Sequence, residues 1–203
     1  MKHITTKQAA RGAKGQLVFG TGEREIAKVV IDSRQADESA LFVAIKGENQ
    51  DGHIYADSAA KLGCRVFLLS REDIAEQIKE QYSDAEILLV EETVKGLQEL
   101  SRWYLAQFSI IKVAVTGSTG KTSTKEMIAA VLSSTFRVSK TPANHNNDIG
   151  MPMAILSMPL DTEVAVLEMG MNHFREIAYL SEIAHPDVAV IINIGTMHIE
   201  YLG

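Results

Sequence analysis

The chain has 203 residues, of which 46% are hydrophobic and 23% are charged. This composition is typical of a folded globular protein and excludes an intrinsically disordered chain. The formal net charge of -6 disfavours binding along a nucleic-acid backbone, because like charges repel. The sequence therefore indicates a globular protein without nucleic acid as a general partner.

Three features bear on the compartment. Cys64 is the only cysteine, which excludes an intramolecular disulfide and is compatible with reducing surroundings. Residues 1–6 are not followed by the apolar run of a secretory signal. No apolar stretch reaches the roughly 20 residues that a membrane-spanning helix needs. We therefore expect a cytoplasmic protein with no membrane span.

Residues 1–91 form a first block in which short strand-like runs surround a helical one. A helix is predicted over residues 55–62, and Gly63 stands where a glycine commonly ends a helix. We expect a small N-terminal α/β domain. The strand-like runs, rich in β-branched and other apolar residues, lie at 28–31, 40–45, 65–69 and 87–90.

Residues 92–203 form the second block, which opens with a helical pattern. Leu97, Leu100, Tyr104 and Phe108 recur at helical spacing, so one side of a helix is predicted to face a core. Continuous apolar runs follow, and they are typical of parallel strands covered on both faces. We expect a mostly parallel α/β domain. The runs lie at 112–116, 164–167 and 188–192.

A glycine-rich turn joins the first of these strands to a helix, and residues 116–123 read Thr-Gly-Ser-Thr-Gly-Lys-Thr-Ser. Glycines let the backbone fold around a phosphate, and N–H groups at the start of a helix point at the anion. Lys121 can reach the β- and γ-phosphates, and the hydroxyl of Thr122 can ligate Mg²⁺. The expected phosphate-binding residues are Gly117, Ser118, Thr119, Gly120, Lys121, Thr122 and Ser123.

The turn departs from the general P-loop pattern at one position. That pattern has a glycine five residues before Gly120, where this chain has Val115. The departure disfavours a generic kinase or GTPase. The alternative is an ordinary connection from a strand to a helix in which the lysine occurs by chance. This alternative is less favoured, because the motif lies between a strand and a helix, the context that a phosphate-binding loop needs.

Polar residues follow the later strands. Glu168 ends one strand, and a carboxylate at the crevice edge of a parallel sheet can hold the Mg²⁺ of a nucleotide. His198 lies just past the last strand, where a lone histidine is otherwise simply structural or exposed. Residues 144–152 are rich in asparagine and end in turn-forming residues, which by themselves indicate either a polar loop or a binding loop.

The motifs in this order resemble the Mur ligases, over essentially the whole chain. In that family the residues at the positions of Glu168 and His198 ligate magnesium. The resemblance also implies catalytic roles for Lys121 and His198. Asn144 and Asn147 are implied to bind the nucleotide. The first block resembles the family's UDP-binding domain. Its implied substrate-binding residues are Ser33, Arg34, Lys46, Gly47, Asp51 and His53.

The resemblance implies an ATP- and Mg²⁺-dependent enzyme of peptidoglycan synthesis. The segment 144–152 favours the member that joins D-alanyl-D-alanine to UDP-N-acetylmuramoyl-tripeptide through an acyl phosphate. The related ligase that adds a diamino acid to the muramoyl-dipeptide precursor and a non-catalytic nucleotide-binding fragment remain alternatives. The full-length protein is expected to be a monomer.

Two features depart from the family. The pair at 174–175 stands where the family pattern has a glycine before Glu176. The chain ends at Gly203, before the family's metal-bridging lysine and its C-terminal domain. We therefore expect an incomplete central domain, no C-terminal domain, and no catalysis by the 203 residues alone.

Overall fold

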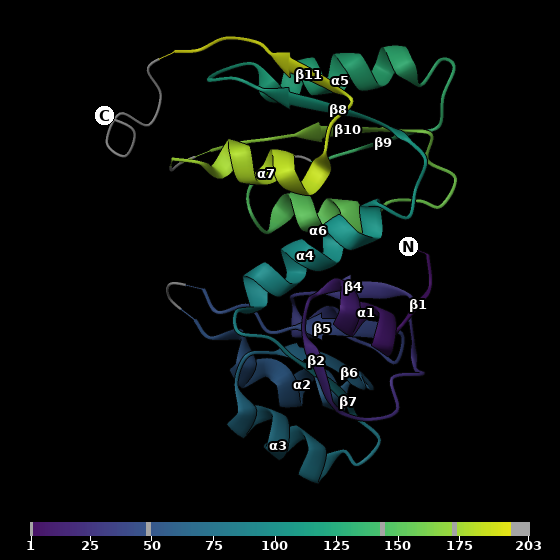
Figure 1. The fold of residues 1–203 in the computed structure, drawn as a ribbon, viewed down its shortest axis with the longest axis vertical. Coiled ribbons are helices and arrows are strands. Elements are labelled where there is room, and N and C mark those ends of the chain that lie inside the picture. Colours follow the sequence, from purple (N-terminus) through teal and green to yellow (C-terminus); the bar gives the residue numbers. More distant parts are fainter. Residues whose placement is uncertain (1, 48–49, 143–144, 172–173, 196–203) are drawn as a thin grey trace. The chain divides into compact units, whose positions relative to one another are not determined.

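The structure is a computed structural model that describes residues 2–47, 50–142, 145–171 and 174–195. The chain divides into two compact units, residues 1–103 and 104–203 (Figure 1). The boundary falls near the end of helix α4 (Thr93–Leu105), so the helix that opens the second block of the sequence is grouped mostly with the first unit. The division into functional domains after residue 91 stays a prediction.

A five-stranded sheet forms the centre of the first unit, in the order β2-β7-β6-β5-β4. Strands β4 to β7 are parallel, an orientation that was not predicted for this block, and β2 adds an antiparallel edge. A separate antiparallel pair joins β1 to β3. The strands are β1 (Ile4–Thr5), β2 (Gln16–Phe19), β3 (Glu25–Ile26), β4 (Lys28–Val30), β5 (Ala40–Val43), β6 (Val66–Leu69) and β7 (Glu86–Leu89).

Helices and two short 3-10 turns connect these strands. Gly63 follows α2 with φ +99°, which confirms its predicted place at the end of that helix. Phe42 and Phe67 meet edge to face in the core, with ring centroids 6.4 Å apart. Helices α1 and α3 are additional to those expected from the sequence. The helical elements are α1 (Thr6–Gly12), η1 (Ser33–Gln35), η2 (Gly52–Tyr55), α2 (Ala56–Lys61) and α3 (Glu72–Gln81).

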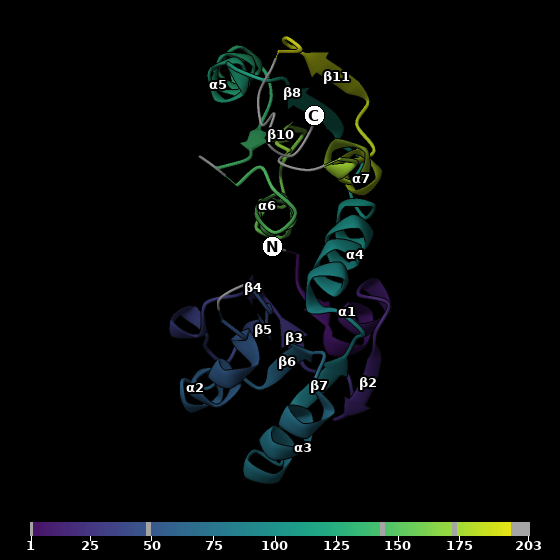
Figure 2. The ribbon, with the colours of Figure 1, turned by 90° about the vertical axis from the view of Figure 1, so that its left-hand side faces the viewer.

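The second unit contains a four-stranded parallel sheet in the order β11-β8-β10-β9. Helix α5 covers one side of this sheet and α7 the other (Figures 1 and 2). The expected parallel α/β arrangement is therefore confirmed. The elements are β8 (Ile111–Thr116), α5 (Lys121–Leu132), β9 (Val138–Lys140), α6 (Gly150–Leu156), β10 (Val164–Glu168), α7 (Glu176–Ala184) and β11 (Val188–Ile191).

Helix α6 corrects the expectation that the asparagine-rich segment simply ends in a turn. Gly150 begins the helix, and Pro152 lies in its first turn. Proline is tolerated there because the first N–H groups of a helix have no acceptor within it. Met151 and Pro152 are buried, so packing selects the helix over the turn that local composition favours.

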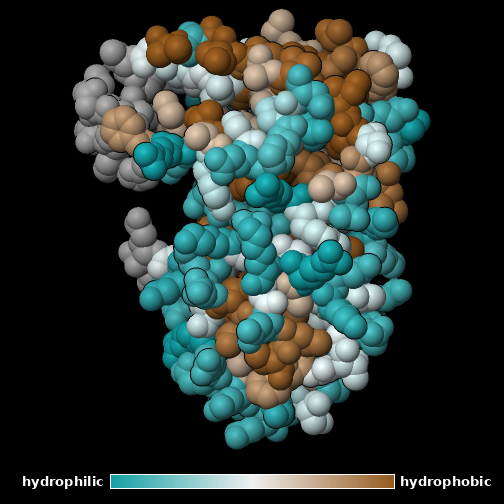
Figure 3. Space-filling view, viewed as in Figure 1, coloured by the Kyte–Doolittle hydropathy of each residue, from teal (hydrophilic) through white to brown (hydrophobic). Residues whose placement is uncertain are grey.

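Apolar side chains lie on the surface where α5 and β11 meet the solvent (Figure 3). Met127 and Val131 on α5 are 69% and 72% exposed, and Ile191 on β11 is 64% exposed. Strand β11 is also an edge of the sheet. An apolar edge of this kind favours association with other chains or other segments.

Membrane crossing can be judged from the helices. Within the part of the chain that the structure describes, every helix is too short or too polar to cross a bilayer. The longest helix, α4, has 13 residues, against the roughly 20 that a span requires.

Candidate functional site

The strand order of the second unit creates a crevice between two neighbouring strands. The connection from β8 leads across β10 to β9, whereas the connection from β10 leads back across β8 to β11. Parallel sheets bind ligands where adjacent strands send their connections in opposite directions. The carboxyl ends of β8 and β10 carry the glycine-rich turn and Glu168, so the fold brings these two predicted features together.

The glycine-rich turn has the backbone shape that its sequence predicts. Gly117 and Gly120 have φ values of +148° and +81°, in the region that only glycine adopts freely. Gly120 caps α5, which begins at Lys121. The N–H groups in the first turn of α5 have no acceptor within the helix, so they are available to an anion.

Lys121 folds back over the turn. Its Nζ donates hydrogen bonds to the carbonyl oxygens of Gly117, at 2.8 Å, and Ser118, at 3.3 Å. The ammonium group is therefore held above the turn in which a phosphate would lie. This is the position from which a lysine neutralises phosphate charge.

Glu168 is buried at the crevice and contacts side chains from separate segments of the chain. Its Oε1 accepts hydrogen bonds from Thr122 Oγ1, at 3.2 Å, and from Asn146 Nδ2, at 2.8 Å. Its Oε2 lies 3.2 Å from Lys125 Nζ. Glu168 and Lys125 are 1% and 0% exposed, so the two charges are paired out of water.

The donor set suits a small oxygen-preferring cation. Among the described residues, no three His, Cys, Asp or Glu side chains gather as a metal cage. Mg²⁺ does not need such a cage, because it is usually held by one or two carboxylates together with phosphates and water. Glu168 Oε2 is buried and has no hydrogen bond, although Lys125 Nζ lies 3.2 Å from it, and Thr122 supplies a hydroxyl beside the same carboxylate. These residues fit the expected ion.

The asparagine-rich segment organises the crevice. Asn147 Oδ1 accepts from the N–H of Gly150, at 2.7 Å, so it shapes the entry into α6. The backbone oxygen of Asn146 accepts from Gly170 N at 2.7 Å. Asn144 and His198, a predicted nucleotide ligand and a predicted metal ligand, lie outside the described residues.

Three functional candidates were not predicted from the sequence: Lys125, Asn146 and Asn193. Lys125 and Asn146 contact Glu168, and Asn193 contacts the glycine-rich turn. Asn146 lies within the asparagine-rich segment 144–152, but no role was predicted for it. For Lys125 the local signal is that it falls one helical turn after Lys121 and therefore lies on the same side of α5.

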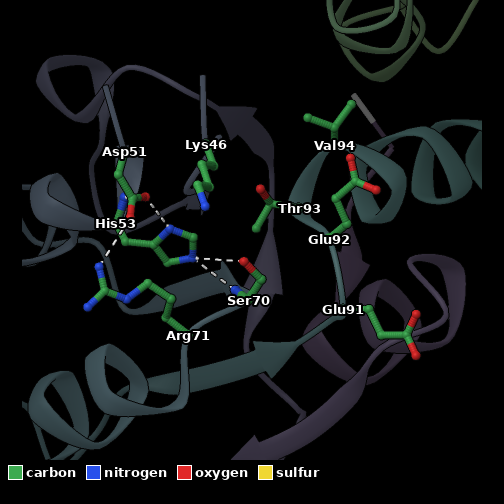
Figure 4. Close-up of a pocket in the computed structure, with 9 residues that line it drawn as sticks. All are labelled: Lys46, Asp51, His53, Ser70, Arg71, Glu91, Glu92, Thr93 and Val94. Atoms are coloured by element: carbon green, nitrogen blue, oxygen red, sulfur yellow. Dashed lines mark hydrogen bonds and ion pairs between the residues drawn. The ribbon is translucent and has the colours of Figure 1, made fainter. Parts of the chain in front are cut away.

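The first unit has a pocket of about 390 Å³ at the carboxyl ends of β5, β6 and β7 (Figure 4). Three of the predicted substrate-binding residues, Lys46, Asp51 and His53, belong to it. The side chain of Lys46 points into the space between the strand ends. The lining consists of Lys46, Asp51, His53, Ser70, Arg71, Glu91, Glu92, Thr93 and Val94.

A hydrogen-bond chain fixes one wall of this pocket. The N–H of Ser70 donates to His53 Nε2 at 2.9 Å, so Nδ1 carries the ring proton and donates to Asp51 Oδ1 at 2.6 Å. Arg71 Nη1 donates to Asp51 Oδ2 at 3.1 Å. Burial alone raises the pKa of Asp51, but hydrogen bonds from His53 and Arg71 outweigh it and lower that pKa to about 2.

The ring of His53 is buried, with its side chain 0% exposed, and its two nitrogens contact Asp51 and Ser70. Gly47 donates its N–H to Gln50 O at 2.9 Å and shapes the same loop. Ser33 and Arg34 lie in η1 and are not among the residues that line the pocket. Arg34 instead pairs with Asp32 at 2.6 Å.

A parallel sheet with a glycine-rich turn, a lysine and a buried carboxylate at one crevice defines the architecture of a P-loop domain. Comparisons with known proteins identify the family. Residues 115–203 match the Mur ligase middle domain, and residues 25–105 match the Mur ligase family catalytic domain. The chain belongs to the Mur ligase family.

Individual relatives agree with this assignment. The UDP-N-acetylmuramoyl-tripeptide–D-alanyl-D-alanine ligase of Bacillus subtilis is 41% identical over 98% of this chain and 43% of its own length. The structure of MurF from Acinetobacter baumannii has a TM-score of 0.89 and 34% identity, over 98% of this chain and 43% of its own.

A third relative is a structure with a bound nucleotide. The MurF ligase of Thermotoga maritima, solved in complex with ADP, has a TM-score of 0.75 and 38% identity, over 85% of this chain and 38% of its own. The chain thus spans less than half the length of each of these relatives.

Proposed function

We propose that this chain is part of an ATP-dependent ligase that joins D-alanyl-D-alanine to UDP-N-acetylmuramoyl-tripeptide in peptidoglycan synthesis. The observation that carries the proposal is the contact between Thr122 and Glu168 beneath the glycine-rich turn. A hydroxyl beside a carboxylate offers the kind of oxygen ligands that the magnesium of a bound nucleotide requires, and this supports the proposal. The relatives with this architecture bear the name of that ligase.

The reaction forms an amide in two steps. A terminal carboxylate oxygen of the tripeptide attacks the γ-phosphorus of ATP, and ADP leaves as an acyl phosphate forms. The amine of D-alanyl-D-alanine then attacks the acyl carbon, and inorganic phosphate leaves with the proton balance completed by solvent. Both reactants of the first step are anions, so charge neutralisation is the main catalytic demand.

The residues of the crevice divide this task. Lys121 neutralises the β- and γ-phosphates, and the first turn of α5 binds them through its N–H groups. Thr122 and Glu168 would hold Mg²⁺, which would supply further positive charge. His198 is proposed as a second magnesium ligand and catalytic residue.

The pocket of the first unit is proposed to bind the UDP-linked precursor. Lys46 and Arg71 bring cationic side chains to the strand ends, where a diphosphate can be recognised. The hydrogen bonds of Asp51 with His53 and Arg71 fix the wall of the pocket beside these cationic side chains. Ser33, Arg34 and Gly47 remain proposed contacts of the same ligand.

The diamino-acid-adding ligase is the less favoured alternative, because the Bacillus subtilis relative carries the D-alanyl-D-alanine name. Phosphate release with each amino substrate, measured on the complete protein that contains this chain, separates the two. Release that depends on D-alanyl-D-alanine supports the proposal, and release that depends on a diamino acid contradicts it. Cytoplasmic location and a monomeric state remain proposals.

Nucleotide binding can be tested on the 203-residue chain. Lys121→Ala is expected to weaken ADP binding about 10- to 100-fold in calorimetry, because charged hydrogen bonds to phosphate contribute about 1.5–3 kcal/mol. Lys112→Ala is the matched control, since Lys112 pairs with Asp187 at the opposite end of β8. Equal ADP affinity in the Lys121→Ala variant and wild type would contradict the P-loop assignment.

A further inference from the structure

Asn193 emerges beside the glycine-rich turn because of strand pairing. Strand β11 pairs with β8 in parallel, and the ladder continues as Ile192 N donates to Thr116 O at 3.0 Å. The next residue is Asn193, which is exposed and follows the carboxyl end of β11. The pairing of β11 with β8 therefore brings the side chain of Asn193 to the turn that follows β8.

The amide of Asn193 uses both of its ends on the turn. Its Oδ1 accepts from the N–H groups of Ser118, at 2.9 Å, and Thr119, at 3.1 Å. Its Nδ2 donates to Thr119 Oγ1 at 3.0 Å and to Thr119 O at 3.3 Å. Since Oδ1 faces two backbone donors, the orientation of the amide is determined by its partners.

Two further contacts hold the same edges together. Gly195 N donates to Ser118 Oγ at 2.7 Å. A Cβ on Gly117 would lie 3.1 Å from Ile192 Cβ, so the backbone of the turn packs directly against the end of β11. The first half of the turn is thus attached to β11 before any nucleotide is present.

We propose that Asn193 is a positioning residue that preshapes the phosphate-binding turn. It occupies the N–H groups of Ser118 and Thr119, and this leaves the N–H groups at the start of α5 as the ones directed at the phosphates. The inference rests on the proposed binding of ATP phosphates by the second unit.

The physical reason is the cost of ordering the turn. A binding loop that is already held in its bound shape loses less conformational freedom when the ligand arrives. This turn has Val115 where the general P-loop pattern has its first glycine, so a side chain from a neighbouring strand takes over part of the positioning. Asn193 does not need to touch the phosphates to affect their binding.

Amide exchange measured by NMR on the nucleotide-free chain tests the contact itself. In Asn193→Ala, the amide of Thr119 should exchange about tenfold faster or more, because it loses its acceptor side chain. The amide of Ser118 should change less, because it also donates to the backbone oxygen of residue 193, at 3.2 Å, which the variant keeps. Asp187→Ala is the matched control, since Asp187 Oδ2 accepts from Lys112 N and links the same two strands at their other end. Exchange in the turn should be unchanged in that control.

Calorimetry with ADP and Mg²⁺ tests the consequence. Asn193→Ala should weaken ADP binding about tenfold with an unchanged melting temperature, whereas Asp187→Ala should not. Asn193→Asp retains the acceptor but places a negative charge near the phosphates. It should restore slow amide exchange without restoring ADP affinity, a split that a purely structural role would not produce.

The outcomes separate this inference from the proposed function. If Lys121→Ala weakens ADP binding as expected and Asn193→Ala leaves both amide exchange and affinity unchanged, the role of Asn193 is wrong and nucleotide binding stands. If ADP fails to bind the wild type, the nucleotide proposal fails on this chain. In that case, unchanged amide exchange in Asn193→Ala would still overturn the positioning role.

Discussion

Thr122 Oγ1 donates a hydrogen bond to Glu168 Oε1 over 3.2 Å, although the two residues are 46 positions apart. The contact exists because β10 pairs directly with β8, whose carboxyl end leads into α5. A hydroxyl at the start of a phosphate-binding helix thereby meets the carboxylate at the end of the neighbouring strand. The pair forms the proposed magnesium site.

Thr122→Ala should reduce the gain in ADP affinity that Mg²⁺ provides. The variant removes one oxygen ligand and its hydrogen bond to Glu168 but keeps the carboxylate, so the magnesium-dependent part of the affinity should fall about tenfold. Calorimetric titration with ADP, with and without Mg²⁺, measures this difference. Thr124→Ala is the control, since it removes the same hydroxyl from the same helix. Equal magnesium dependence in Thr122→Ala and wild type would refute the site.

The ion pair of Lys125 and Glu168 should be strongly coupled in stability. Lys125→Met leaves the buried carboxylate without its counter-charge and should lower the free energy of unfolding by about 3–5 kcal/mol. Adding Glu168→Gln removes the second charge, so the double variant should lose much less than the sum of the two single variants. Urea denaturation of all four proteins measures the coupling. Additive losses would show that the two charges do not depend on each other.

Asp51 should make the first unit sensitive to acid. Its folded pKa of about 2 lies below the ordinary value of 3.8, so its stabilisation is present above about pH 4 and is lost as the pH falls toward 2. Asp51→Asn should lower the unfolding free energy by about 1–2 kcal/mol near neutral pH, with partial solvent exposure allowed for.

Denaturation curves of wild type and Asp51→Asn at a series of pH values check this dependence. The gap between the two should close as the pH falls from 4 toward 2. His53 and Arg71 face the carboxylate and are present in both proteins, so the comparison isolates the charge of Asp51. A gap that stays constant down to pH 2 would rule out the proposed charge effect.

Arg175→Gly should stabilise the second unit. Arg175 caps α7 with φ +71°, a left-handed conformation that costs a residue with a Cβ about 1–2 kcal/mol. Glycine relieves this cost but adds freedom to the unfolded chain, so a net gain of about 0.5–1 kcal/mol is expected.

Thermal denaturation measures that gain. Ala178→Gly, an exposed position within α7, is the matched control and should lose about 1 kcal/mol because its backbone is helical. Destabilisation by both substitutions would show that the left-handed conformation is not a source of strain. The position coincides with the one where the family pattern has a glycine, so the structure supplies a physical reason for that pattern.

Local patterns in the sequence predicted much of the fold. The parallel strands of the second unit follow from continuous apolar runs, and Gly63 ends its helix in the first unit as expected. The glycine-rich turn was also predictable, because the conformations of Gly117 and Gly120 and the start of α5 depend on neighbours in the chain. Such features need no knowledge of distant residues.

Other elements depended on packing. Helix α6 begins within a segment whose composition favours a turn, and the burial of Met151 and Pro152 selects the helix. The antiparallel strand β2 is short and only partly buried, so its alternation is weak, and its place beside β7 is a long-range pairing. Local propensity is too small to decide either element against tertiary contacts.

The sequence by itself determined which residues can carry the chemistry: the glycine-rich turn, Lys121, and the carboxylate of Glu168 at a strand end. Only the tertiary structure decided that Lys125 would be the counter-charge of Glu168 and that Asn193 would hold the turn. Both contacts depend on the strand order β11-β8-β10, which places residues from three separate segments at one crevice. Strand order follows from packing over the whole sheet, so no local pattern encodes it.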